Sequence, residues 1–88
     1  MNTFKEDIFS NKIRADSYEI YPYYALEIIY SPSNSPNNFI ANASINPLAI
    51  VIFDKTDDEY FLYLFDENKK EDEAYITEIL EKFVDFSF

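Results

Sequence analysis

Residues 48–65 read LAIVIFDKTDDEYFLYLF, in which two runs of β-branched and aromatic side chains flank a short polar segment. Such residues favour the pleated surface of a sheet, whereas the KTDD segment has the composition of a turn. The stretch therefore predicts an antiparallel β-hairpin. Both faces of both strands would be apolar, so we expect this sheet to need covering on two sides.

A C-terminal amphipathic helix is predicted for residues 68–86, which read NKKEDEAYITEILEKFVDF. Asn68 is the predicted N-cap, with Glu71 three residues later. Apolar residues recur at helical spacing and form one predicted buried stripe: Ile76, Ile79, Leu80, Phe83 and Val84. Asp72 and Glu73 would lie in the first turns, where the helix dipole favours negative charge.

An alternating segment precedes the hairpin in residues 18–30, YEIYPYYALEIIY. One predicted face carries Tyr18, Ile20, Tyr24, Leu26, Ile28 and Tyr30, and the other carries Glu19, Tyr21, Tyr23, Ala25, Glu27 and Ile29. Pro22 cannot donate a ladder hydrogen bond, so it marks a strand start, a bulge or a sheet edge. We place the regular strand at residues 23–30.

The N-terminal segment has the spacing of a short helix. Thr3 followed by Glu6 has the pattern of a capping box. The apolar positions that follow recur at helical spacing: Phe4, Ile8, Phe9 and Ile13. The pattern predicts a short amphipathic helix over residues 4–13.

The connection between the first strand and the hairpin is long and begins with turn-forming residues at 31–38. A small apolar patch follows at residues 39–45. We expect a partly ordered loop whose Phe39 and Ile40 pack on the core, with a short helix or strand as the alternative.

These elements predict one α+β domain over residues 1–88, because the chain has room for a single modest core and 48% of it is apolar. The expected order is a short N-terminal helix, a three-stranded antiparallel sheet with a long loop after its first strand, and a C-terminal amphipathic helix. Two short helices cover only part of such a sheet, so a partner or a second copy would cover the remainder.

Residue types that are absent exclude most catalytic chemistry. The chain has no histidine, cysteine or glycine, so it lacks the commonest general base, any thiolate and any glycine-rich phosphate loop. The carboxylates of DKTDDE (54–59) offer oxygen ligands for a hard cation, but we expect a solvated turn without metal. We therefore expect no enzyme, no cofactor and no catalytic or metal-binding residue.

The lack of glycine also bears on the turns and on the origin of the chain. Average usage predicts about six glycines, so Asn, Asp, Ser and Pro must form the turns here. The chain is instead rich in residues that AT-rich codons encode, such as Asn, Lys, Ile and Tyr. This composition favours a viral or mobile-element origin.

Negative charge is concentrated in the second part of the chain. Residues 54–88 carry twelve acids and four bases, whereas residues 1–53 carry five acids and three bases, which gives net charges of −8 and −2. Such a chain is repelled by nucleic acid and by anionic membranes and is attracted to basic surfaces.

Partner-binding residues are expected among these acids and on one face of the first strand. They are Asp54, Asp57, Asp58, Glu59, Asp66, Glu67, Glu71, Asp72, Glu73 and Glu78, extended by Glu81 and Asp85 on the helix, together with Tyr21 and Tyr23. For the acids the alternative is a solvated surface that serves solubility, and for the tyrosines it is ordinary strand packing.

The expected location is the cytoplasm. The longest uninterrupted apolar stretch, residues 47–53, is far shorter than the roughly 20 residues of a membrane helix. The first residues include acids and no apolar h-region, so a signal peptide is not expected. For a viral protein, the location would be the cytoplasm of the host cell.

Three functions fit these features. The first is a small acidic inhibitor that blocks the basic surface of a host-defence or nucleic-acid enzyme as a DNA mimic. In size, acidity and predicted pattern the chain resembles small phage-encoded inhibitors, among them anti-CRISPR proteins and uracil-DNA glycosylase inhibitors; no motif carries this general likeness, so it implies no residue roles. The second is an immunity protein or antitoxin, and the third is a homo-oligomeric module, such as a homodimer.

Overall fold

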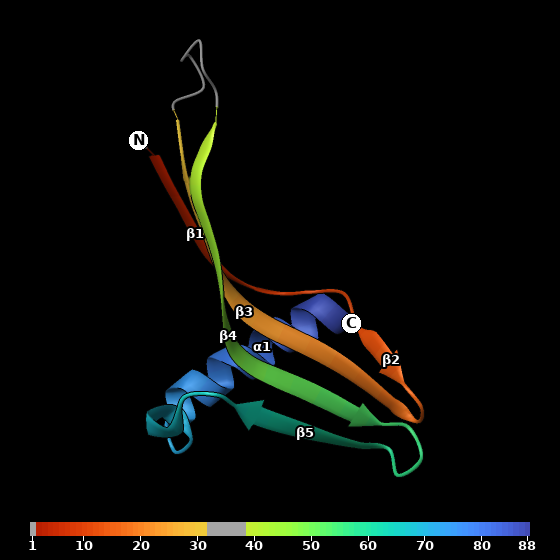
Figure 1. The fold of residues 1–88 in the computed structure, drawn as a ribbon. Coiled ribbons are helices and arrows are strands. Elements are labelled where there is room, and N and C mark those ends of the chain that lie inside the picture. Colours follow the sequence, from red (N-terminus) through yellow and green to blue (C-terminus); the bar gives the residue numbers. More distant parts are fainter. Residues whose placement is uncertain (1, 32–38) are drawn as a thin grey trace.

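The computed structural model describes residues 2–31 and 39–88 and consists of a curled antiparallel sheet with one C-terminal helix (Figure 1). The elements follow in the order β1 (Asn2–Phe9), β2 (Ile13–Ala15), β3 (Tyr18–Tyr30), β4 (Ile40–Asp54), β5 (Glu59–Leu64), the 3-10 turn η1 (Glu67–Lys69) and α1 (Glu73–Ser87). The predicted class of three strands between two helices is therefore wrong: the fold is mostly β, with one helix.

The sheet has the order β1-β3-β4-β5, and β2 also pairs with β3, on the same side as β1. The register is antiparallel throughout, with Phe9 opposite Tyr23, Tyr23 opposite Ala49, and Ala49 opposite Leu64. The hairpin predicted from residues 48–65 is confirmed as β4 and β5. β3 is longer than the predicted strand and begins at Tyr18.

The segment predicted as an N-terminal helix forms β1 and β2 instead. Its apolar spacing fits a helix, but eight consecutive pairs with β3 satisfy the backbone of residues 2–9. In the extended form Phe9 reaches the core, whereas Phe4 and Ile13 stay exposed. Pairing with a long neighbouring strand thus overrides a short local helix pattern.

Pro22 lies inside β3 rather than at its start, opposite Ile50 of β4. Its carbonyl accepts a hydrogen bond from the Ser10 N–H at 3.0 Å, so this edge of Pro22 faces the residues between β1 and β2. In an antiparallel sheet the N–H and C=O of one residue point to the same neighbour. The missing N–H therefore faces Ser10, just after the end of β1, and proline costs only the one reciprocal bond to Ser10 at the end of this pairing.

The core forms between α1 and one face of the sheet (Figure 1). Phe83 is its centre: its ring lies 4.9 Å from that of Tyr21 and 5.6 Å from that of Phe9. The buried residues are Phe9, Tyr21, Tyr23, Ala49, Val51, Leu64, Ile79 and Phe83. All six sheet members lie on the face toward α1, as the register and strand alternation require.

The helix begins later than predicted, because Asp72 rather than Asn68 is its N-cap. Asp72 Oδ1 accepts a hydrogen bond from the Tyr75 N–H at 3.1 Å. Residues before it form η1, whose first turn is closed by Asp66 Oδ1 and the Asn68 N–H at 2.9 Å. The predicted stripe also divides, since Ile79 and Phe83 are buried but Leu80 and Val84 are exposed.

Aspartates form the tight turns, which confirms the expectation drawn from the absence of glycine. Asp16, between β2 and β3, and Asp58, between β4 and β5, both have φ of 54°. Positive φ is tolerated by Asp and Asn better than by other residues that carry a Cβ.

The connection predicted as a loop is largely part of β4, which begins at Ile40. Phe39 and Ile40 are exposed, so their predicted packing on the core is wrong. β1, β3 and β4 continue beyond α1 as a three-stranded extension, here called the arm, which is closed by hydrogen bonds between Ser31 and Phe39 (Figure 1). Of the turn-forming segment predicted at residues 31–38, residues 32–38 lie outside the described residues.

Replacing Ile79 by Ala should lower the free energy of unfolding by about 2–4 kcal/mol, because this side chain is 1% exposed and its removal leaves a cavity. Leu80→Ala on the neighbouring, 42% exposed position is the matched control and should cost less than half as much. Urea unfolding of both variants measures the difference. Equal costs would contradict the orientation of α1.

Glu19 should contribute to stability in a pH-dependent way. Lys12 Nζ lies 2.7 Å from Glu19 Oε2, and this hydrogen bond holds the pKa of Glu19 below its ordinary value. Its contribution is therefore present above the ordinary pKa and is lost as pH falls through the lowered one. We expect the stability difference between wild type and Glu19→Gln to shrink between about pH 6 and about pH 3. Chemical unfolding across this range measures it, and a constant difference would contradict the bridge.

Candidate functional site

Asp54, a predicted partner-binding acid, serves the hairpin turn instead. Its Oδ1 accepts hydrogen bonds from the Thr56 N–H at 3.0 Å and the Asp57 N–H at 3.4 Å. The residue is buried, and this arrangement is a side-chain-closed turn of the kind that aspartate forms. Asp54 is therefore a structural residue of the β4–β5 hairpin.

Asp66 and Asp72 also have structural roles, as the caps of η1 and α1. Asp72 is in addition 3.6 Å from Lys69 Nζ, and Glu67 is 3.0 Å from Lys70 Nζ. The contact with Glu67 raises the pKa of Lys70. These acids thus have local partners, although their exposed oxygens still add negative charge to this end of the molecule.

Three acids at the tip of the β4–β5 hairpin are different: Asp57, Asp58 and Glu59 are all exposed. Within residues 2–31 and 39–88, their carboxylates form no ion pair and no hydrogen bond. Asp58 supplies the positive φ of the turn, but this conformation does not need its charge. Adjacent like charges repel, so the fold gains nothing from this concentration of carboxylates.

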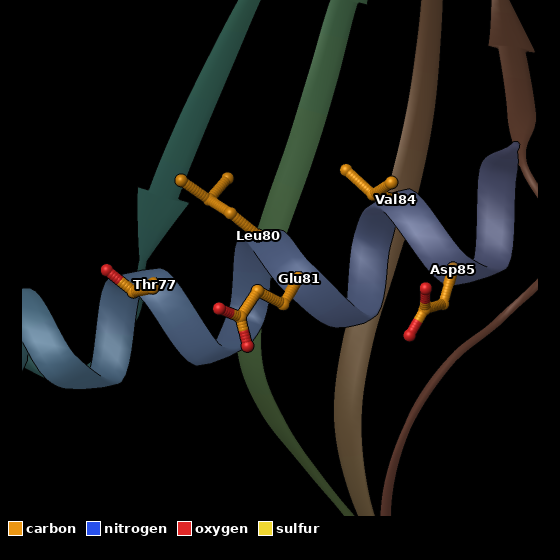
Figure 2. Close-up of a pocket in the computed structure, with 5 residues that line it drawn as sticks. All are labelled: Thr77, Leu80, Glu81, Val84 and Asp85. Atoms are coloured by element: carbon orange, nitrogen blue, oxygen red, sulfur yellow. The ribbon is translucent and has the colours of Figure 1, made fainter.

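A second group of acids lies on α1 and its entrance, at Glu71, Glu73, Glu78, Glu81 and Asp85, all exposed. Figure 2 shows Glu81 and Asp85 along one side of the helix, next to Leu80 and Val84. Glu78 is 3.5 Å from Lys82 Nζ, the one cation of this helix. The outward side of α1 is thus strongly negative.

Together these residues form what we call the acidic surface: Asp57, Asp58 and Glu59 at the hairpin tip, and Glu67, Glu71, Glu73, Glu78, Glu81 and Asp85 at η1 and α1. The tip and the acids around η1 lie at opposite ends of β5, which is six residues long, or about 20 Å, whereas α1 runs back from η1 until Phe83 lies 5.8 Å from Tyr60 between ring centres. The charge is therefore spread over the hairpin tip, η1 and α1 and is not gathered in a pocket.

Tyr21 and Tyr23 are in the core, at 9% and 2% exposure, and do not belong to any binding face in this fold. Tyr23 packs on Phe9 with ring centres 4.5 Å apart. Its hydroxyl accepts a hydrogen bond from Lys82 Nζ at 3.2 Å, and this bond raises the pKa of Lys82. Alternation placed these tyrosines correctly with Glu19 on one face, but that face is the one that α1 covers.

The opposite face of the sheet, here called the open face, is apolar and carries no helix among the described residues (Figure 1). One row across it consists of Ile13, Ile20, Ile52 and Phe61, and the next of Pro22, Ile50 and Tyr63. Ile13, Phe61 and Tyr63 are exposed, and the other four are half-buried. This surface was anticipated only in part, from the apolar character of both hairpin faces.

A strand pattern that would have predicted the arm lies in residues 41–47, ANASINP. These residues alternate small or apolar side chains with polar ones. Period-two alternation is typical of a strand with two unlike faces. In the arm, Ala43 and Ile45 lie on the open face, and Asn42, Ser44 and Asn46 lie on the other. The pattern was obscured because asparagine and proline usually indicate turns.

The described residues offer little for other chemistry. No group of three His, Cys, Asp or Glu residues among them is placed to hold a metal ion. Within the same residues, none of the helices combines the length and the apolar character needed to cross a membrane. What the geometry does offer is two surfaces for macromolecules, one acidic and one apolar.

Comparison of the chain with protein-family models, with curated proteins and with solved structures finds no match. The acidic surface and the open face are therefore the features from which a function can be inferred.

The structural role of Asp54 can be separated from binding. Asp54→Ala should lower the free energy of unfolding by about 1–2 kcal/mol, because two backbone N–H groups lose their acceptor. Asp57→Ala, three residues further along the same turn and exposed, should change it by less than about 0.5 kcal/mol. Thermal or urea unfolding tests this, and equal effects would show that Asp54 does not close the turn.

Proposed function

We propose that this chain is an acidic binding protein that docks on a basic, nucleic-acid-binding surface of another protein and blocks it. The observation that carries the proposal is the hairpin tip, where the exposed carboxylates of Asp57 and Glu59 form no ion pair and no hydrogen bond with any residue that the structure describes. Residues that cost the fold repulsion and bring it no contact are expected where a partner supplies the contact.

The acidic surface has the extent that such docking needs. The hairpin tip and the acids around η1 lie about 20 Å apart along β5, a distance over which one strand of DNA presents about six phosphates. A basic groove that holds a nucleic-acid backbone would therefore meet carboxylates at both ends of β5. The acids would replace phosphates, as in a DNA mimic.

The composition supports a viral or mobile-element setting, and there the target would be a host-defence or nucleic-acid enzyme in the host cytoplasm. An immunity protein that masks a toxin would use the same acidic surface. The identity of the captured partner separates these cases, because an immunity protein binds a toxin encoded beside it.

Neutralising the tip should abolish partner capture. The test variant combines Asp57→Asn, Asp58→Asn and Glu59→Gln, in which Asn at position 58 tolerates the positive φ of the turn. The matched control combines Asp7→Asn, Asp16→Asn and Glu27→Gln, which removes the same charge outside the acidic surface. Tagged proteins are used in pull-downs from host lysate at low salt, with mass spectrometry of the fractions eluted by NaCl.

We expect wild type and control to capture the same basic nucleic-acid-binding protein. The tip variant should capture at least about tenfold less of it, which corresponds to a loss of about 1.4 kcal/mol in binding free energy. The captured protein should also lose its binding of nucleic acid when the wild-type chain is added. Equal capture by the tip variant, or capture that does not weaken with salt, would contradict docking by charge.

A further inference from the structure

We propose that the open face is the contact surface of a homodimer, in which two copies of the sheet pack face to face. This inference does not depend on the proposed docking of the acidic surface. It starts from the fact that α1 covers one face of a sheet whose other face is also apolar.

The arm shows that the apolar character of the open face is specific to that face. Neither side of the arm lies in the core, so the two sides differ only in sequence. The side that continues the α1-covered face is polar, with Asn42 and Ser44 on β4 and an ion pair of 3.9 Å between Lys5 and Glu27. The other side carries Phe4 opposite Ile28 and Leu26 opposite Ile45. An arm that contacted only water on both sides would not need one polar side and one apolar side.

The distribution of charge identifies the occupant as a second copy. By register, the acids of the open face are Glu6 in the arm and Asp54 and Glu59 at the hairpin end, and Asp54 is buried in its turn. Lys70 lies at the margin, 5.5 Å from the Tyr63 ring. The exposed acids of this face are thus one in the arm and one at the hairpin end, and the rows of apolar residues between them carry neither sign of charge. Two chains of net charge −10 can approach most closely there, with both helices and their acids on the outside.

The size of the face is also that of a dimer interface. Thirteen residues of β3 span about 43 Å, and three to four strands are about 14–19 Å wide, so the face measures roughly 700 Å² in projection. A standard interface buries about 800 Å² on each partner. Two such faces can pack as the layers of a β-sandwich.

One alternative contact between copies is the outer edge of β5, which, like the outer edge of β1, is unpaired in the described part of the chain. Antiparallel pairing of two such edges would bring Asp58 and Glu59 of one copy next to the β5–η1 end of the other. That end carries Asp66 and Glu67, so acids would face acids. The open face avoids this repulsion.

Sedimentation equilibrium from low to high micromolar concentration tests the proposal. The wild-type chain should have twice its 10.4 kDa mass. Ile13→Lys and Ile45→Lys, each tested singly, place a charge at opposite parts of the open face and should raise the dimer dissociation constant at least about tenfold. These positions are 55% and 67% exposed in one chain, so the monomer tolerates the change. Val84→Lys on α1, 51% exposed, is the control and should leave the dimer intact.

Salt gives an independent readout. Because the two copies carry the same charge, screening should strengthen the dimer, whereas it weakens capture of a basic partner. A wild-type mass of 10.4 kDa throughout would overturn the proposal. A dimer that both Lys variants leave unchanged would assign the contact to an outer edge of the sheet, at β5 or β1, and would overturn the open face as well. Unfolding curves confirm that each variant is folded.

Discussion

The structure depends on one constraint: a single helix packs against a sheet whose two faces are both apolar. Ile79 and Phe83 of α1 close one face over Tyr21, Tyr23 and Val51, and this contact forms the core. The other face carries rows of isoleucines and aromatic residues that no described helix covers. A domain of this size gains stability mainly from burial of apolar area. A single chain, however, covers only one of the two apolar faces of its sheet with a helix.

The same constraint explains where the charges lie. Acids are excluded from the core by their desolvation cost, and on the open face they are confined to Glu6 in the arm and to Asp54 and Glu59 at the hairpin end. They gather at the ends of β5 and on the outward side of α1, and there Asp54, Asp66 and Asp72 also close turns and cap helices in a chain without glycine. The remaining acids, above all Asp57 and Glu59, have no such role. The molecule is thus apolar over the centre of the open face and negative at the hairpin tip, around η1 and along α1.

The sequence predicted the hairpin, the C-terminal helix and the aspartate turns, because each follows from local pattern and turn chemistry. It failed for residues 4–13, where pairing with β3 determines the structure and the helical spacing is incidental. It also failed for Tyr21 and Tyr23, since alternation assigns residues to a face but does not say which face the helix covers. The acids of the candidate site were found by composition, whereas their separation into caps and free carboxylates required the hydrogen bonds.

Whether a second copy covers the open face can be measured by NMR, from the solvent accessibility of isoleucine and valine methyl groups to a soluble paramagnetic probe at high protein concentration. In one chain, Ile13 and Ile45 are at least as exposed as Val84. If two open faces pack together, the probe should strongly relax the Val84 methyl groups, and the Ile13 and Ile45 methyl groups should be protected from it. Equal relaxation at all three positions would show that the open face is exposed to solvent and would contradict a dimer formed through this face.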